Sequence, residues 1–259
     1  MMSVPNTQGS LEENVPSRVG AEVKRTPPAQ PDYLTIRYSE QSKPYTTYPS
    51  QLTHYLTENY LKKHTGGKLL DLGCGRGEFL QAFAGEGFVA QGVDREQTNN
   101  AHMTAPVQRC DFSAEALPIE NDFLDIIFNK SVFEHMGEIT PLLRECHRVL
   151  KPGGVMISLV PDYRAQWRHF YDDWTHVRPF TLEGLTQCLE GHEFIVDDSR
   201  HFRQLPLLWK YPYLRPLADV ATLLPESFKR SKWVRFSKEW MLLVVSHKAD
   251  KRKIGGHDD

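Results

Sequence analysis

Three glycines at alternate positions, Gly73, Gly75 and Gly77, follow a short apolar run in the segment LDLGCGRGEF. Glycine lets a backbone turn tightly and approach a ligand, and a helix that follows offers unpaired N–H groups at its start. Such a turn is typical of a nucleotide site. Its spacing departs from the dinucleotide fingerprint, whose third glycine falls one place later, where this chain has Glu78.

The acid two residues before the first glycine indicates which nucleotide the turn suits. A carboxylate at Asp71 would repel a pyrophosphate, but it would attract a ligand that carries an ammonium and a sulfonium there. S-adenosylmethionine (SAM) is such a ligand. Asp94 lies 21 residues after Gly73, at the end of the run FVAQGVD, and is placed to bind both ribose hydroxyls, as in NAD and SAM sites alike. The turn therefore favours SAM over a dinucleotide.

The elements that must position these residues alternate along the chain. A helix capped by Ser50 is predicted to carry one apolar face, formed by Leu52, Tyr55, Leu56 and Tyr60. Strands are then predicted over 68–73, 88–94, 106–111, 123–129 and 154–160, and helices over 77–86 and 140–150. A helix from Thr181 and strands over 192–199 and 240–248 follow. This alternation predicts an α/β fold with a parallel, doubly wound sheet.

The composition is that of an ordinary globular protein. A formal net charge of −2 over 259 residues gives no overall attraction to nucleic acid or anionic lipid. The four cysteines are widely spaced and form no C-x-x-C, which argues against a zinc site or a disulfide framework. The longest apolar runs are strand-sized and the N-terminus lacks a signal-peptide pattern, so we expect a cytoplasmic protein.

We expect one domain between two disordered tails. Residues 1–32 and 249–259 lack apolar periodicity, whereas residues 33–248 form the predicted domain, with its core over 50–200. Residues 203–238 are predicted to be an insertion before the last strand, with eight Lys and Arg against two acids and interleaved aromatic residues. This insertion could serve as a lid, as a dimer contact, or as a surface that binds anionic lipid or a lipid-linked substrate. It could also be a plain solvated face. The oligomeric state stays open.

Four segments together resemble the class I SAM-dependent methyltransferases, in particular the small-molecule and glycan-type enzymes related to the ubiquinone and menaquinone methylases. These segments are LLDLGCGRGEFL, GVDRE, CDFSAEALPIENDFLDIIFNKSVFEHM and LLRECHRVLKPGGVMISLVPD. The resemblance covers roughly residues 50–200. It implies a Rossmann-like, mostly parallel, seven-stranded sheet with helices on both faces, and SAM as the cofactor.

The resemblance also implies a place for each cofactor-binding residue. Around the methionine part of SAM it places Asp71, Gly73, Cys74, Gly75 and Gly77. Asp94 would hold the ribose, and Arg95 would flank the adenine. Asp111 would meet the adenine amino group, Phe112 would lie against the ring, and the backbone of Asn129 would meet the methionine ammonium.

Several of these residues have plainer alternatives. Asp71 could cap the helix or pair with a lysine, and Asp94 and Asp111 could simply form turns at strand ends. Phe112 could be a core residue, because a phenylalanine beside a strand is more often packed than exposed to a ligand.

The residues after the strand at 123–129 argue against methylation of a nucleic-acid base and against metal-assisted methyl transfer. The chain reads NKSVFEH there, not the N-P-P-Y/F motif that grips a flipped base, and it has no Pro-Cys pair for attack on a pyrimidine. Some relatives carry Glu-x-x-Glu-His at this place, but Ser131 replaces the first glutamate. Glu134 and His135 alone are too few ligands for a divalent ion, so we expect no metal and no nucleic-acid base as acceptor.

Residues 163–181 follow the strand at 154–160, where open α/β sheets place their ligand crevice. Within them, DDWTHVRPFT resembles a segment of polysaccharide and O-antigen methyltransferases. Asp173 and His176 are our candidates for orienting or deprotonating a hydroxyl, because an imidazole has a suitable pKa and a carboxylate can hold its tautomer. His135 is a rival base. Alternatively, His176 and Arg178 only pin the loop, and His135 is structural.

These expectations combine into a SAM-dependent methyltransferase that acts on an oxygen, or with second preference a nitrogen, of a small molecule or a sugar or glycan precursor. Methylation of RNA or protein is the first alternative. A non-catalytic SAM-fold binding or regulatory protein is the second. An NAD-dependent oxidoreductase is the most distant, because it needs Asp71 to tolerate a pyrophosphate.

Overall fold

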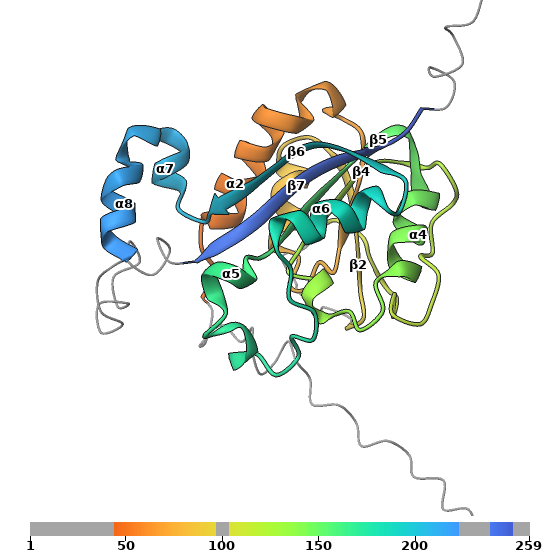
Figure 1. Ribbon diagram of the computed structural model, residues 1–259. Coiled ribbons are helices and arrows are strands. Elements are labelled where there is room, and N and C mark those ends of the chain that lie inside the picture. Colours follow the sequence, from red (N-terminus) through yellow and green to blue (C-terminus); the bar gives the residue numbers. More distant parts are fainter. Residues whose placement is uncertain (1–43, 97–103, 223–238, 251–259) are drawn as a thin grey trace, which may run out of the picture. The chain divides into compact units, whose positions relative to one another are not determined.

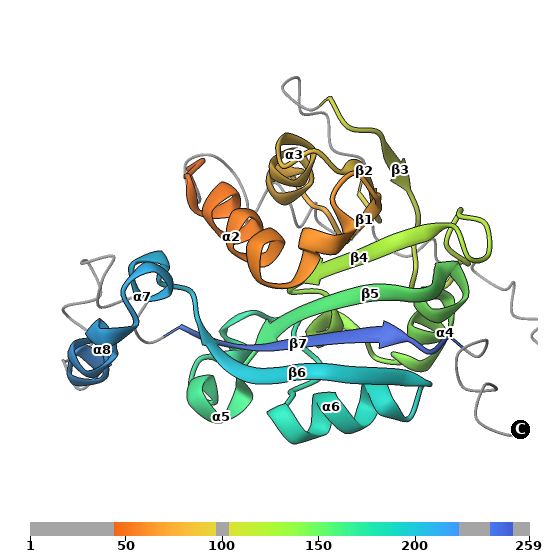
Figure 2. The same cartoon turned by 90° about the horizontal axis from the view of Figure 1, so that it is seen from above.

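Seven strands of the described residues form one sheet in the order β3-β2-β1-β4-β5-β7-β6. Figure 1 shows β6 and β7 running side by side, and Figure 2 labels all seven strands. The computed structural model describes residues 44–96, 104–222 and 239–250. The strands are β1 (Lys68–Leu72), β2 (Val89–Asp94), β3 (Val107–Arg109), β4 (Leu124–Lys130), β5 (Leu150–Pro161), β6 (Phe194–Arg203) and β7 (Trp240–Lys248). Each of them overlaps a predicted strand, although β5 begins four residues before its predicted start, at the end of the predicted helix, and β6 ends four residues after its predicted end.

The strand order runs outward from β1 in both directions. β1 pairs in parallel with β2 on one side and with β4 on the other, and β5 continues this parallel half. β7 is antiparallel to both β5 and β6. The predicted doubly wound, mostly parallel sheet is therefore confirmed. Its switch point lies between β1 and β4, where Leu72 pairs with Asn129, so a ligand crevice is expected beyond these two residues.

Helices cover both faces of the sheet (Figure 2). On one face α4 (Thr140–Val149) and α6 (Leu182–Glu190) contribute to a buried cluster, and on the other α2 (Tyr48–Leu56) and α3 (Glu78–Gly85) do so. Successive side chains of β4 point to opposite faces of the sheet, so Ile127 packs in the first cluster and Phe128 in the second. Burial on both faces explains why the parallel strands read as continuous apolar runs.

The start of the first helix differs from its prediction. Ser50 lies inside α2, which begins at Tyr48 and has Pro49 in its first turn. The fixed φ of proline suits the first turn of a helix, so Pro49 moves the start ahead of the predicted cap. Thr181, by contrast, caps α6 as predicted, because its hydroxyl accepts a hydrogen bond from the backbone of Gly184 at 3.1 Å.

The remaining helical segments are short. They are η1 (Thr57–Leu61), η2 (Lys62–His64), η3 (Phe133–His135), α5 (Tyr163–Gln166), η4 (Phe170–Asp172), α7 (Pro206–Lys210), η5 (Pro212–Leu214) and α8 (Arg215–Thr222). In the part of the chain that the structure describes, no helix combines the length and the apolar character that crossing a bilayer requires.

The described part of the 203–238 insertion forms α7, η5 and α8. Arg203 at its start donates to the Asp219 carboxylate of α8 at 2.6 Å, and Leu205, Leu208 and Ala218 form a small buried cluster. Residues 223–238 lie outside the described residues, as do the predicted tail 1–32 and residues 251–259 of the C-terminal tail. A lid or docking role for the insertion therefore stays a prediction.

Candidate active site

The glycine turn joins β1 to α3 in the left-handed region of backbone conformation. Gly73, Gly75 and Gly77 have φ angles of 73°, 50° and 77°, which residues with a side chain rarely adopt. The N–H of Gly73 donates to the carbonyl of Val93 at 2.8 Å, which anchors the turn on β2. Because α3 begins directly after Gly77, its N-terminal N–H groups lie at the end of this turn.

Close packing also requires glycine at the first position. A Cβ on Gly73 would lie 2.5 Å from Cγ2 of Val132, in the segment after β4. Cys74 packs its sulfur against Gly92 of β2, where a Cβ would lie 2.7 Å from Sγ. Burial raises the pKa of the Cys74 thiol. Cys74 therefore offers a cofactor its backbone and not a thiolate.

Asp71 presents a buried carboxylate with an unsatisfied oxygen. The residue is 2% exposed, and its Oδ2 accepts no hydrogen bond within the described residues. Burial and the charge of Asp94 raise the pKa of Asp71 to about 8, against the effect of a hydrogen bond from the Leu80 backbone. Buried carboxylates are normally paired, so the unsatisfied oxygen agrees with the predicted cationic ligand, and this role of Asp71 stays a prediction. An ammonium or sulfonium fits here and a pyrophosphate does not.

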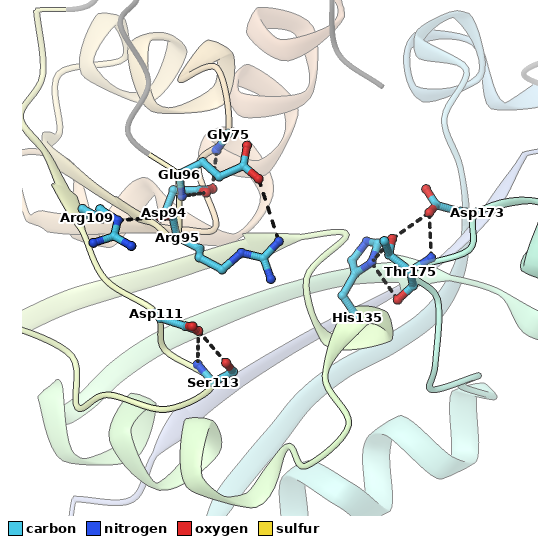
Figure 3. A network of polar contacts seen from close by, with 10 residues as sticks. All are labelled: Gly75, Asp94, Arg95, Glu96, Arg109, Asp111, Ser113, His135, Asp173 and Thr175. Atoms are coloured by element: carbon cyan, nitrogen blue, oxygen red, sulfur yellow. Dashed lines mark hydrogen bonds and ion pairs between the residues drawn. The ribbon is translucent and has the colours of Figure 1, made fainter. Parts of the chain in front are cut away.

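Asp94, at the end of β2, holds the glycine turn from the other side (Figure 3). Its two oxygens accept from the N–H groups of Gly75 at 2.8 Å and Glu96 at 3.0 Å. A carboxylate has about four acceptor positions, so both oxygens keep capacity for ribose hydroxyls. Burial raises the pKa of Asp94. The Arg95 side chain extends towards His135 in Figure 3, and its charge contributes to the lowered pKa of that histidine.

The other predicted cofactor residues lie beyond the ends of β3 and β4. Asp111 accepts from both the N–H and the hydroxyl of Ser113, so it does form the turn that was its plainer alternative (Figure 3). Phe112 packs against the cluster that α4 and α6 share and stays partly exposed. The buried Asn129 side chain donates to the Ser158 hydroxyl at 2.9 Å, which turns the amide towards β5.

The predicted acceptor residues come together from two segments far apart in the sequence. The carboxylate of Asp173, which is 6% exposed, accepts from the N–H and the hydroxyl of Thr175 at 3.1 and 2.6 Å (Figure 3). The same hydroxyl lies 2.9 Å from Nδ1 of His135. A hydroxyl has one proton, and the carboxylate takes it, so Nδ1 of His135 is the donor to Thr175. Asp173 therefore orients His135 through Thr175.

His176 is oriented by a backbone carbonyl. Its Nδ1 lies 2.6 Å from the carbonyl oxygen of Phe170, which can only accept, so this nitrogen carries the proton. The Phe170 carbonyl holds Nδ1 of this ring, and a role of the Asp173 carboxylate in orienting His176 stays a prediction. The rings of His135 and His176 meet edge to face, with centroids 4.8 Å apart. The structure thus pairs the two candidate bases.

Hydrogen bonds between main chains join the two segments that carry this pair. The N–H groups of Val177 and Arg178 donate to the Glu134 carbonyl at 2.9 and 3.0 Å. The Arg178 guanidinium donates to the carbonyl oxygens of Met136 and Gly137. Arg178 therefore does pin the loop, as the structural alternative held, and it thereby sets the distance between the two histidines.

Burial sets the charge state of the residues around the pair. Glu134 is fully buried, and burial raises the pKa of its carboxyl to about 8, although the charge of Lys130 acts in the opposite direction. Burial and the charge of His176 lower the pKa of His135 to about 4, so His135 is a neutral imidazole at pH 7. A neutral imidazole with a protonated Nδ1 has its lone pair on Nε2.

Two residues of this site were not assigned to it from the sequence. Thr175 links Asp173 to His135, and the Glu134 side chain lies fully buried beside them. The available signals were the Asp-x-Thr spacing and the Glu-His dipeptide. Neither signal shows which side chains face inward, because that depends on contacts between segments about forty residues apart.

Relatives of known sequence point to one family. A family model described as a methyltransferase domain matches residues 45–198. A probable S-adenosylmethionine-dependent methyltransferase of Mycolicibacterium smegmatis is 30% identical over 140 residues, 52% of this chain and 54% of the relative. A ubiquinone biosynthesis O-methyltransferase of Chelativorans sp. is 34% identical over 102 residues, 37% of this chain and 40% of the relative. The chain thus matches about half or less of these curated relatives' length.

A solved structure shares the fold. The 1,6-didemethyltoxoflavin-N1-methyltransferase of Burkholderia thailandensis, solved with bound S-adenosylhomocysteine, matches with a TM-score of 0.56 and 15% identity. The match covers 84% of this chain and 86% of that chain. The family model covers more than half of the present chain, including the glycine turn, Asp71, Asp94 and both segments around His135 and His176. The chain belongs to the S-adenosylmethionine-dependent methyltransferases.

Proposed function

We propose that this protein methylates a hydroxyl oxygen of a small molecule, or of a sugar or glycan precursor. SAM supplies a methyl group that is already activated on a sulfonium, so the protein must position the acceptor and remove its proton. In the balanced reaction the acceptor oxygen bonds to the methyl carbon as the carbon–sulfur bond breaks. The products are the methyl ether, S-adenosylhomocysteine and the hydroxyl proton.

The observation that carries this proposal is the His135–His176 pair. Both Nδ1 atoms are held as donors by neighbouring oxygens, so in the neutral form of each ring the lone pair lies on Nε2. A hydroxyl needs such an acceptor for its proton as the bond to the methyl carbon forms. Arg95, which follows Asp94 of the cofactor half, is near enough for its charge to act on His135. This proximity to the cofactor half supports the pair as the proposed acceptor site.

Exposed aromatic rings in the segment that carries His176 support a ring-shaped acceptor. Trp167, Tyr171 and Trp174 are 57%, 58% and 64% exposed, in the segment that also holds His176. Large exposed aromatic side chains are unusual on a protein surface and are typical of sites that bind sugars or planar molecules. These rings offer the flat apolar surface that such an acceptor needs.

The test is a screen for S-adenosylhomocysteine release with the purified chain and SAM. Phenols, sugars and nucleotide sugars are compared with amines, RNA and protein at equal concentration. We expect turnover with hydroxyl compounds, and a loss of about 10²–10⁴-fold in His176→Ala with SAM affinity unchanged. His54→Ala is the matched control, because His54 lies on α2 with its side chain 66% exposed and pairs with Glu86.

Two results would count against the proposal. Turnover confined to amines, RNA or protein would replace the hydroxyl acceptor with the alternative class. Turnover in His176→Ala equal to that of His54→Ala would remove the histidine pair from the mechanism.

A further inference from the structure

We propose that Glu134, His135 and His176 bind a divalent first-row transition-metal ion. One potential ligand atom from each residue lies within 4.8 Å of the other two. The sequence argued against a metal because it showed only the adjacent Glu134 and His135. The loop after η4 brings His176 to them as the third ligand. Binding of the ion stands on this geometry, whereas its role in methyl transfer rests on the proposed function.

The carboxylate of Glu134 is the strongest sign of a missing partner. The residue is 0% exposed, and neither Oε1 nor Oε2 makes a hydrogen bond of normal geometry within the described residues, although the Ser131 hydroxyl and the Glu134 N–H lie close enough to lower the pKa of the carboxyl. Lys130 acts on it only at longer range, since no ion pair within 4.0 Å joins the two in the described part of the chain. Native proteins rarely bury a carboxylate without a partner, because its desolvation is then uncompensated. A cation between Glu134 and the two histidines would supply that partner.

Both histidines are held in the tautomer that a metal ligand needs. Nδ1 of His135 donates to Thr175, whose hydroxyl is fixed by Asp173, and Nδ1 of His176 donates to the Phe170 carbonyl. Metal-binding histidines characteristically donate their second nitrogen to a carbonyl or to a carboxylate-linked group, which orients the ring. Each ring here therefore has the outer partner of a ligand, and its lone pair lies on Nε2.

The site is also held together before any ion binds. The carbonyl of Glu134 accepts from the N–H groups of Val177 and Arg178, so the strand-end segment and the loop cannot separate without breaking these bonds. Metal–nitrogen bonds of about 2.1 Å place neighbouring ligand atoms about 3–3.5 Å apart. Starting from separations of up to 4.8 Å, binding therefore needs a contraction of up to about 1.5 Å, which side-chain rotation can provide.

The chemistry of the donor set narrows the choice of ion. Two imidazole nitrogens and one carboxylate suit Zn²⁺, Fe²⁺, Co²⁺ or Mn²⁺ better than Ca²⁺ or Mg²⁺, which prefer oxygen ligands. Three protein ligands leave coordination positions for oxygens of the acceptor. A hydroxyl bound there would lose its proton more readily, which serves methylation of oxygen.

The test uses Co²⁺, whose visible absorption reports nitrogen and oxygen ligands without any acceptor or activity. Untagged full-length chain is treated with a chelator, dialysed and titrated with Co²⁺, and Zn²⁺ is then added as a competitor. We expect a saturable d–d spectrum at one equivalent that Zn²⁺ abolishes. Glu134→Gln and His176→Ala should each weaken binding at least about 100-fold, and Thr175→Val, which changes an outer partner, about 10–100-fold. His54→Ala should bind as the wild type does.

SAM affinity and thermal unfolding of each variant show whether it is folded. Absence of a saturable spectrum in the wild type would overturn the proposal. So would equal binding by wild type and by folded Glu134→Gln and His176→Ala, which would mean that surface histidines bind the ion. Hydroxyl methylation that persists in thoroughly chelated protein would leave the proposed function standing, with the histidines acting directly as bases, and would remove the ion from the reaction.

Discussion

The Asp71 carboxylate is expected to cost the SAM-free protein stability in exchange for cofactor affinity. Asp71→Asn keeps the shape of the side chain and removes its charge. The pKa of Asp71 is about 8 in the folded chain, against an ordinary value of 3.8. A carboxyl whose pKa rises on folding binds its proton more tightly in the folded state, so its contribution to stability falls as the pH rises from about 4 to about 8.

The size of the effect follows from this difference in pKa. At pH 7.5 this difference in pKa lowers the free energy of unfolding by about 3–5 kcal/mol relative to a protonated Asp71, which is an upper bound for a fully buried group. We expect Asp71→Asn to raise the free energy of unfolding of the SAM-free protein by about 2–4 kcal/mol at that pH, or the melting temperature by about 5–12 °C. The same substitution should weaken SAM binding about 10–150-fold, because hydrogen bonds to charged groups contribute about 1.5–3 kcal/mol.

The assay is urea unfolding of both proteins between pH 5.5 and 8.5, with SAM affinity measured by calorimetry. The stability gain should shrink towards low pH. Asp125→Asn is a control of opposite sign, since Asp125 accepts from Lys151 Nζ at 2.6 Å and from the Lys68 N–H at 2.8 Å. The Asp125→Asn variant should have a free energy of unfolding about 1 kcal/mol lower than that of the wild type. If Asp71→Asn also destabilised the SAM-free protein at pH 7.5, Asp71 would be a structural partner and the reasoning would be wrong.

Three further outcomes follow from the cofactor half. The Kd of the wild type for SAM should fall about tenfold per pH unit from about pH 6 to 8 and then level off, because the ligand's cation needs ionised Asp71; a flat calorimetric profile contradicts this. Asp94→Ala should weaken SAM binding by about 1–3 kcal/mol through loss of charged hydrogen bonds, and an unchanged Kd would leave Asp94 with the turn alone. Gly73→Ala should lower the free energy of unfolding by about 1–3 kcal/mol, because its Cβ meets Val132 at a φ of +73°. Thermal unfolding followed by circular dichroism measures it, and an unshifted midpoint would show that the turn relaxes.

Local sequence patterns were sufficient to predict most of the helices and strands and the position of the glycine turn. Strand and helix periodicity depends on neighbours within a few residues, and the left-handed φ values at Gly73, Gly75 and Gly77 depend on the turn itself. The first helix shows the limit even at this range. A proline one residue before Ser50 placed the start of α2 earlier than the predicted cap did.

The place of the last strand could not be read from the sequence. β7 is the final element of the described residues, yet it lies between β5 and β6 and is antiparallel to both. An apolar run of nine residues identifies a buried strand, but periodicity carries no information about its neighbours or direction.

The apolar pattern and the glycine spacing were enough to predict a doubly wound sheet with an acid and three glycines at the end of its first strand. Those features follow from local backbone preferences and from the apolar pattern of buried strands. Contacts made in the folded chain bring His176 beside His135 and bury the Glu134 carboxylate next to them with both of its oxygens unsatisfied. The reason is that hydrogen bonds between Glu134 and the backbone at 177–178 join segments more than forty residues apart, and no local pattern encodes that distance.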